Sequence, residues 1–335
     1  QLNGRIGDAL QKLHPDDPTL SARLAHHYHE AGRTGDAVTQ AILAGELALN
    51  RYALSQACSH FEHAAQWAEA ADWAPEPSQR AQLHAGWAEA LRRSAQPDAA
   101  LAHSAEALPD AEGLLTLHLI YQMAALQTTQ GSGPETFSRL AERLDAEAQE
   151  PWILGLIRCA QGFWTALRGD ADRARQYAAE GWGWLRHMTE NEAVPPWVLS
   201  RATIILARTH ALWGEWHHVR RYAAKALTRN TAHHDVYGAA DAHATLAQAC
   251  YGLGENEEAR AHAEEALSKT EEAGDLRLQG KALYPLGQVL LDARRLTEVQ
   301  GVIRRLLDVA EQTGDLEARA WGRLLQAELL MRTGK

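Results

Sequence analysis

The sequence predicts an all-α fold, a right-handed solenoid of stacked antiparallel helix pairs. Ala, Leu, Glu, Arg and Gln dominate the 335 residues and β-branched residues are scarce, a mixture that favours helix over long windows. We find no convincing stretch that alternates apolar and polar residues as a half-buried strand does. The C-terminal half carries a 40-residue repeat, and a period of this size indicates stacked supersecondary units.

The repeat is clearest at its acidic and glycine positions. Asp235, Asp275 and Asp315 open three successive units at a spacing of 40 residues. A second set with the same spacing is Gly214, Gly254, Arg294 and Gly334. Glycine accepts the left-handed conformation that ends a helix, and aspartate accepts hydrogen bonds from the free N–H groups of the next helix. Each unit is therefore expected to hold two helices, for example 235–253 and 255–273.

Extending this pattern along the chain predicts about seventeen helices. Most prolines fall at their starts or in the loops between them, as the missing N–H requires, whereas Pro285 lies inside a helix that it is expected to kink. The predicted ranges are 1–13, 19–31, 35–49, 53–71, 77–94, 97–107, 111–129, 134–148, 151–168, 170–188, 196–213, 215–230, 235–253, 255–273, 275–293, 295–313 and 315–332.

Small residues and turn glycines resemble the tetratricopeptide-repeat (TPR) family. Its consensus has a Gly-Asp or Gly-Glu turn and an alanine five residues further on, and small residues let neighbouring helices approach closely. Residues 75–150 fit poorly, and Arg294 replaces a turn glycine. The matching positions are Ala25, Tyr28, Gly32, Ala37, Ala41, Ala44, Gly169, Asp170, Ala174, Ala178, Gly254, Glu255, Ala259, Ala263, Ala266 and Leu267.

The first 70 residues or so carry a more specific resemblance. The segments 6–10, 24–32, 44–49 and 52–57 look like the region that follows the ATPase and winged-helix modules of STAND-class signal-transduction ATPases, including large LuxR-type transcription regulators. In that family the helical array is the sensor, which binds an inducer or a partner protein. The resemblance implies the sensor role alone, because no Walker motif or helix-turn-helix is identified in this sequence.

The chain is expected to be a fragment of a longer protein. It begins at Gln1 rather than Met, and the helix 315–332 has no following partner helix. By repeat quality we divide it into an N-terminal TPR-like segment, 1–72, a degenerate helical segment, 73–150, and a regular TPR-like segment, 151–335.

Charge and cysteine content narrow the class of partner. The formal net charge of −10 disfavours direct binding to nucleic acid, and no apolar run is long enough to cross a membrane. Cys58, Cys159 and Cys250 lie far apart among small apolar residues, which indicates free buried thiols and a reducing cytoplasm.

No motif for catalysis is found. Nucleophile elbows, metalloprotease motifs, phosphate loops and dinucleotide loops are all missing from the sequence, so the chain is not expected to be an enzyme or to hold a cofactor. His26, His29 and Glu30 share a helix face that could bind a metal. Ordinary packing and surface roles explain these histidines better, and no metal site is predicted.

Eleven tryptophans are unusual for a chain of this size, and five of them gather within 35 residues. Two interpretations remain open: packing between helices at a repeat junction, or an aromatic patch for a ligand or partner. These five are Trp182, Trp184, Trp197, Trp213 and Trp216.

In TPR proteins the first helix of each pair lines an inner, concave groove. Here the equivalent positions mix arginine, glutamine and tyrosine, a surface that suits an extended peptide or a polar small ligand. The predicted binding residues are Arg201, Arg208, Asp241, Gln248, Tyr251, Lys281, Tyr284, Gln288 and Trp321, with Ile204, Leu212, Ala244, Asp292, Leu324, Glu328 and Arg332 at the remaining positions.

We therefore expect a sensor module of a larger bacterial regulator that binds a protein partner or a small-molecule inducer in this groove. Binding would shift the population toward one arrangement of the array. The alternative is a stand-alone scaffold for protein–protein assembly, and self-association is open in both cases. Replacing Arg208 or Tyr251 by alanine is expected to weaken binding without lowering the melting temperature.

Overall fold

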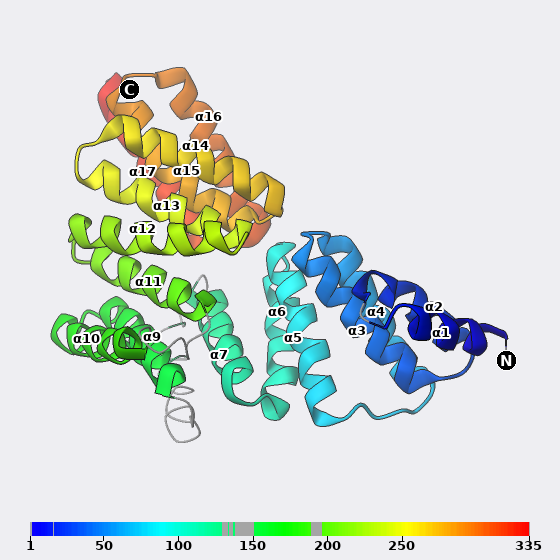
Figure 1. Cartoon of the computed structure of the whole chain (residues 1–335). Helices are drawn as coiled ribbons and strands as arrows, with labels where there is room; N and C mark the ends of the chain where they lie inside the picture. The colour runs from blue at the N-terminus through cyan, green and yellow to red at the C-terminus, as the bar shows by residue number, and fades with distance from the viewer. Residues whose placement is uncertain are drawn as a thin grey trace. The chain divides into compact units, whose positions relative to one another are not determined.

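The computed structural model describes residues 2–15, 17–128, 133, 137, 151–188 and 196–334. Within these residues there are sixteen α-helices and no strand (Figure 1). The predicted all-α fold of stacked helix pairs is therefore confirmed. The helices are α1 (Leu2–Leu13), α2 (Ser21–Glu30), α3 (Thr34–Asn50), α4 (Leu54–Ala70), α5 (Pro77–Arg93), α6 (Pro97–Ala107), α7 (Gly113–Thr128), α9 (Pro151–Leu167), α10 (Ala171–Met188), α11 (Pro196–Ala211), α12 (Trp216–Ala232), α13 (Val236–Gly252), α14 (Asn256–Ala273), α15 (Leu276–Asp292), α16 (Leu296–Thr313) and α17 (Leu316–Thr333).

The chain divides into two compact units, Gln1–Leu119 and Ile120–Lys335, and the division falls inside α7. In the first unit, Phe61 is fully buried between helices. A Cβ atom added at Gly45 or Gly86 would lie 2.6 or 2.5 Å from its ring, so glycine on α3 and on α5 is what lets these helices close over it. The three-segment division by repeat quality remains a prediction.

The second unit has two layers of helices. Each of α11, α13, α15 and α17 contacts the first helix of the preceding pair, which makes one layer with α9. The second helices α10, α12, α14 and α16 each contact the first helices before and after them. Side chains from the first-helix layer therefore come together from segments about 40 residues apart in the sequence.

From Gly214 onward, the turns of the second unit adopt the left-handed conformation at a constant step of 20 residues. The predicted turn glycines do so, and so does Arg294, with φ of 57°. His234 also does so, with φ of 54°. An L-residue adopts this conformation at some cost in free energy, so repeat geometry overrides the local preference at these two positions. The full set is Gly214, His234, Gly254, Gly274, Arg294, Gly314 and Gly334.

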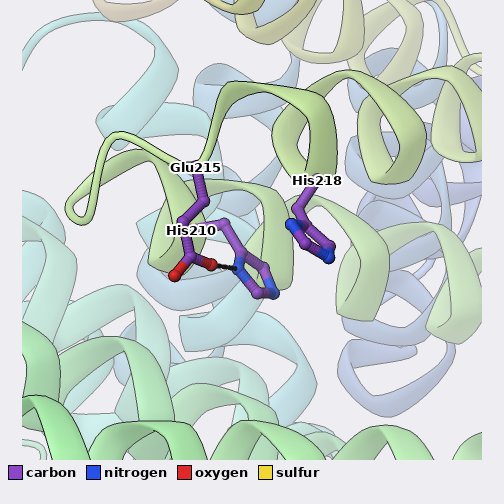
Figure 2. Close-up of side chains that lie close together, drawn as sticks. All are labelled: His210, Glu215 and His218. Atoms are coloured by element: carbon purple, nitrogen blue, oxygen red, sulfur yellow. Dashed lines mark hydrogen bonds and ion pairs between the residues drawn. The ribbon is translucent and has the colours of Figure 1, made fainter.

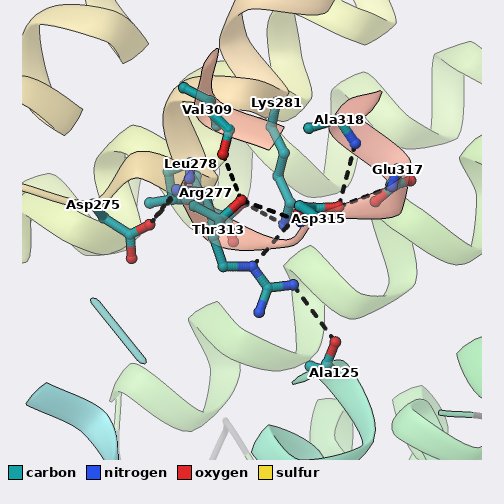
Figure 3. Close-up of polar contacts among 11 residues, drawn as sticks. Ala125, Asp275, Arg277, Leu278, Lys281, Val309, Thr313, Asp315, Glu317 and Ala318 are labelled. Carbon is teal, nitrogen blue, oxygen red and sulfur yellow. Dashed lines mark hydrogen bonds and ion pairs between the residues drawn. The ribbon is translucent and has the colours of Figure 1, made fainter. Parts of the chain in front are cut away.

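The three repeat-opening aspartates cap their helices as predicted. Asp235, Asp275 and Asp315 each accept a hydrogen bond from a backbone N–H in the first turn of α13, α15 and α17. Figure 3 shows the last two in the same region, where Arg277 lies 3.5 Å from Asp315 and donates to the carbonyl of Ala125 on α7. The caps therefore fix the helix starts.

Observed helix bounds lie within a few residues of those predicted, and the helix predicted at 134–148 falls outside the described residues. α15 continues through Pro285, and the expected kink there remains a prediction. The three cysteines are free, and two of them are buried. No helix in the described part of the chain is both long and apolar enough to cross a membrane.

Candidate functional site

One candidate site is a groove on the first-helix layer of the second unit, which we call the first-helix groove. Its cavity is small, about 150 Å³, and five successive first helices contribute to it. Leu167 and Leu212 lie at its edge with 38% and 47% of their surfaces exposed. The lining residues are Phe163, Leu167, Arg208, Ala211, Leu212, Ala244, Thr245, Gln248, Lys281, Tyr284, Pro285, Glu317 and Trp321.

The charges in this groove are compensated. Arg208 on α11 binds both carboxylate oxygens of Asp241 on α13, at 2.5 and 2.6 Å. Lys281 on α15 lies 3.8 Å from the same carboxylate. Burial alone raises the pKa of Asp241, but Arg208 and Lys281 outweigh it, so the pKa is lowered and the carboxylate stays ionised. This pairing argues against the expectation that Arg208 can be replaced without a loss of stability.

Lys281 is the cation of the groove with the weakest partner. Burial, then the nearby Arg208 charge, lowers the pKa of Lys281 to about 8, so the amine is still mostly protonated at pH 7. Burial raises the pKa of the neighbouring Glu317 carboxyl. A mostly charged amine beside a carboxyl that is easily neutralised favours an incoming negative group at Lys281.

Aromatic and polar side chains continue the groove wall. The rings of Tyr284 and Trp321 stack with centroids 5.2 Å apart, and Gln288 donates to the Tyr284 hydroxyl at 3.2 Å. Tyr251 donates to Asp292 at 3.2 Å, and Arg332 binds the other oxygen of Asp292 at 2.8 Å. These contacts hold the rings in position across neighbouring repeats.

The structure thus brings five of the nine predicted binding residues to one groove. Arg201 and Asp241 line a second pocket of about 150 Å³, while Gln288 and Tyr251 make the contacts just described. That these residues bind a partner remains a prediction. The five are Arg208, Gln248, Lys281, Tyr284 and Trp321.

The second candidate site is a cleft of about 560 Å³ between α10, α12 and the end of α11, which we call the α10–α12 cleft. It continues into a smaller hollow that shares four of its lining residues and adds Lys225 and Arg229. The lining of the larger part is Arg175, Ala178, Ala179, Trp182, Gly183, Arg186, Leu206, His210, Trp213, Glu215, His218, Arg221 and Tyr222.

His210, Glu215 and His218 lie together on one wall of this cleft (Figure 2). The Nδ1 atom of His210 is 2.5 Å from one oxygen of Glu215, and Arg175 donates to the other oxygen at 3.1 Å. The His210 and His218 rings stack at 4.8 Å. Both oxygens of the carboxylate are thus engaged, and a guanidinium stands beside them, so this trio is better suited to shape the wall than to bind a cation.

A second group with metal-ligating atoms is Cys250, Glu255 and Glu258. Burial raises the pKa of the Cys250 thiol to about 11, so it is protonated at neutral pH and a poor ligand. Both oxygens of Glu255 accept from Arg220 at 2.7 Å. This group is therefore also committed to internal contacts.

The five clustered tryptophans divide between the two interpretations. Trp182 and Trp213 line the α10–α12 cleft. Trp216 packs on Gly252, where an added Cβ would lie 2.4 Å from its ring. Trp184 is 47% exposed and does not line the cleft, and the side chain of Trp197 is outside the described residues.

Sequence reasoning missed the basic side of the cleft. Arg221, Lys225 and Arg229 follow one another at intervals of four residues on α12, a spacing that places them on one helix face. That signal is visible in the sequence. The spacing alone does not predict a binding site, because Arg186 of α10 reaches the same hollow only through helix packing.

No protein-family model matches the chain, and no curated protein sequence matches it. Among solved structures, a Rap protein complexed with Competence and Sporulation Factor superposes with a TM-score of 0.55 at 13% identity, over 89% of each chain. The chain has a tetratricopeptide-repeat fold.

A second solved structure has the same fold. It is a signal transduction ATPase with numerous domains that carries a tetratricopeptide repeat sensor, from Pyrococcus horikoshii, with a TM-score of 0.54 at 13% identity. The superposition covers 99% of this chain and 49% of that one. The chain therefore spans about half the length of that ATPase.

Proposed function

We propose that the chain is a binding module that takes up an extended segment of a protein partner in the first-helix groove. The observation that carries this is the combination of exposed apolar side chains, a stacked aromatic pair and a weakly paired lysine in one groove. Exposed apolar groups that share a groove mark interaction sites more often than isolated ones do.

The size of the groove favours a peptide over an enclosed small ligand. About 150 Å³ accommodates one side chain, whereas pockets that enclose a small molecule usually measure roughly 300–1,000 Å³. Leu167 and Leu212 would contact an apolar anchor of the peptide, and Trp321 would pack beside it. Lys281 would pair with a carboxylate of the same peptide.

Binding rather than catalysis is the proposed activity. The three thiols are poor nucleophiles, because burial raises the pKa of Cys58, of Cys159 to about 12 and of Cys250 to about 11. We further propose that the module is cytoplasmic and acts as the sensor of a larger STAND-type ATPase or transcription regulator. A fold shared with a tetratricopeptide repeat sensor supports this context.

A random dodecapeptide library panned against the 335-residue chain tests the proposal. The dissociation constant of one selected peptide is then measured for the wild type and for Leu212→Ser. Loss of one buried leucine contact is expected to weaken binding about tenfold. Leu330→Ser is the matched control, because Leu330 is also exposed, at 44%, but does not line the groove.

Failure to select any peptide, or equal losses in Leu212→Ser and Leu330→Ser, would contradict peptide binding in this groove. The scaffold alternative is separated by a functional readout on the parent protein. A sensor changes the activity of an attached ATPase when the peptide binds, and a scaffold leaves that activity unchanged.

A further inference from the structure

We propose that the α10–α12 cleft binds a small ligand with an aromatic ring and several phosphate charges, that is, a nucleoside polyphosphate. The cleft lies on the second-helix side of the second unit and shares no lining residue with the first-helix groove. The inference is therefore independent of peptide binding.

The first argument is charge. Among the described residues, five cationic side chains line the cleft and its adjoining hollow, against one carboxylate, that of Glu215. This concentration occurs in a chain whose formal net charge is −10, so a general excess of basic residues does not explain it. A cleft with low-dielectric walls focuses such a field on an anion. The five cations are Arg175, Arg186, Arg221, Lys225 and Arg229.

Contacts within the protein engage only some of the N–H groups of these cations. Arg175 and His210 share Glu215 between them. The guanidinium of Arg221 and the amine of Lys225 lie over the rings of Tyr222 and Trp182, at 5.1 and 5.6 Å from the centroids. Cation–π contacts of this kind leave N–H groups open to an acceptor.

Arg229 gives the most direct indication of a missing acceptor. Its Nη1 atom is buried and has no hydrogen-bond partner among the described residues. Burial also lowers the pKa of its side chain. A buried charged donor without an acceptor is costly. Because Arg229 also lines the hollow, its guanidinium would gain by turning toward a phosphate oxygen bound there.

The second argument is the aromatic wall. Trp182 and Trp213 are partly exposed in the cleft, and Tyr222 stacks on His210 at 5.5 Å. Flat rings on the wall of a cleft of about 560 Å³ suit a planar base, which gains by stacking. The cations of α12 extend from this wall into the adjoining hollow, so a base and its phosphates fit side by side.

Isothermal titration calorimetry of the 335-residue chain tests the inference with three probes in EDTA: ATP, inorganic pyrophosphate and adenosine. We expect ATP to bind at least tenfold more tightly than pyrophosphate or adenosine, because only ATP engages both parts of the cleft. Arg229→Met and Lys225→Met should each weaken ATP binding about tenfold, the loss of one charge-assisted hydrogen bond. Quenching of tryptophan fluorescence should follow the same dissociation constants.

Arg305→Met is the matched control. Arg305 is a cation on the second-helix layer that pairs with Glu271 at 3.2 Å outside the cleft, so its loss should change ATP binding less than twofold. Lys225 is exposed, so Lys225→Met is expected to fold. This variant tests ATP binding in the cleft if Arg229→Met does not fold. Absence of ATP binding, equal affinity for pyrophosphate, or an equal loss in Arg305→Met would each overturn the inference.

Discussion

The first-helix groove and the α10–α12 cleft belong to one compact unit but differ in how their charged side chains are paired. In the groove, Arg208 and Lys281 both face Asp241. Among the described residues of the cleft and its adjoining hollow, five cations line the walls with a single carboxylate, that of Glu215, which pairs with Arg175. A buried ion pair costs little net free energy when it is complete and a great deal when one partner is lost. The groove charges therefore stabilise the folded structure, whereas the proposed role of Lys225 and Arg229 in the cleft is to bind an anionic ligand.

The largest expected effect comes from removing the carboxylate of the groove. Asp241→Asn leaves Arg208 and Lys281 partly buried beside each other without a counter-charge, and should lower the free energy of unfolding by about 3 kcal/mol. Urea denaturation at pH 7 measures it. Asp308→Asn, at an exposed position on α16, should change stability by less than about 0.5 kcal/mol. A loss below about 1 kcal/mol for Asp241→Asn would mean that the groove charges are not mutually dependent.

A pair of histidines that joins the two helix layers, His243 and His262, is expected to have an intermediate effect on the free energy of unfolding. The Nδ1 atoms of His243 on α13 and His262 on α14 lie 3.0 Å apart, which requires at least one neutral ring. Burial, and then the charge of His262, lowers the pKa of His243 to about 4. His84 and His103 repeat this arrangement in the first unit, at 2.9 Å.

Acidification should therefore cost stability. The unfolded histidines take up protons near pH 6.5, whereas folded His243 does so only near pH 4. The contribution is thus lost as the pH falls from about 6.5 to about 4. Allowing for solvent screening at these half-buried sites, we expect a loss of about 1–2 kcal/mol per pair. His243→Phe should reduce the slope of unfolding free energy against pH over this range, and an unchanged slope would refute the coupling of the pair.

The fold was predictable because its signals are local. A left-handed residue followed by an aspartate cap sets the starts of α13, α15 and α17, so Gly274 with Asp275 and Gly314 with Asp315 mark helix boundaries directly. Even Arg294, where the glycine is missing, was placed correctly by the repeat spacing. His234 was not anticipated as a left-handed residue, because its own type gives no such signal.

The candidate sites were less predictable because they depend on contacts across repeats. Helix periodicity placed Arg208 and Asp241 on equivalent faces, but the pairing joins residues 33 apart in sequence, and periodicity alone does not give it. For the same reason, the tryptophan cluster could not be divided into Trp182 in the cleft and Trp216 in the packing. The neighbouring helix determines whether each tryptophan lines the cleft or packs between helices.

The smallest predicted effect is a gain in the free energy of unfolding, opposite in sign to the losses above. It tests directly whether charges in the cleft are less well paired than charges in the groove. If the cleft cations are uncompensated, then removing one should stabilise the protein in the absence of ligand. Arg229→Met keeps most of the side-chain volume and its apolar contacts, and should raise the free energy of unfolding by about 1 kcal/mol. Denaturation without ATP measures it, with Arg305→Met as control, since an exposed ion pair contributes less than about 1 kcal/mol.

Stability and binding should then move in opposite directions at Arg229, whereas Asp241→Asn should lower stability outright. A loss of stability in Arg229→Met would mean that its guanidinium already has a stabilising partner and that the cleft is compensated like the groove. A gain in stability together with weaker ATP binding is the combination expected of a side chain held in an unfavourable environment for its ligand.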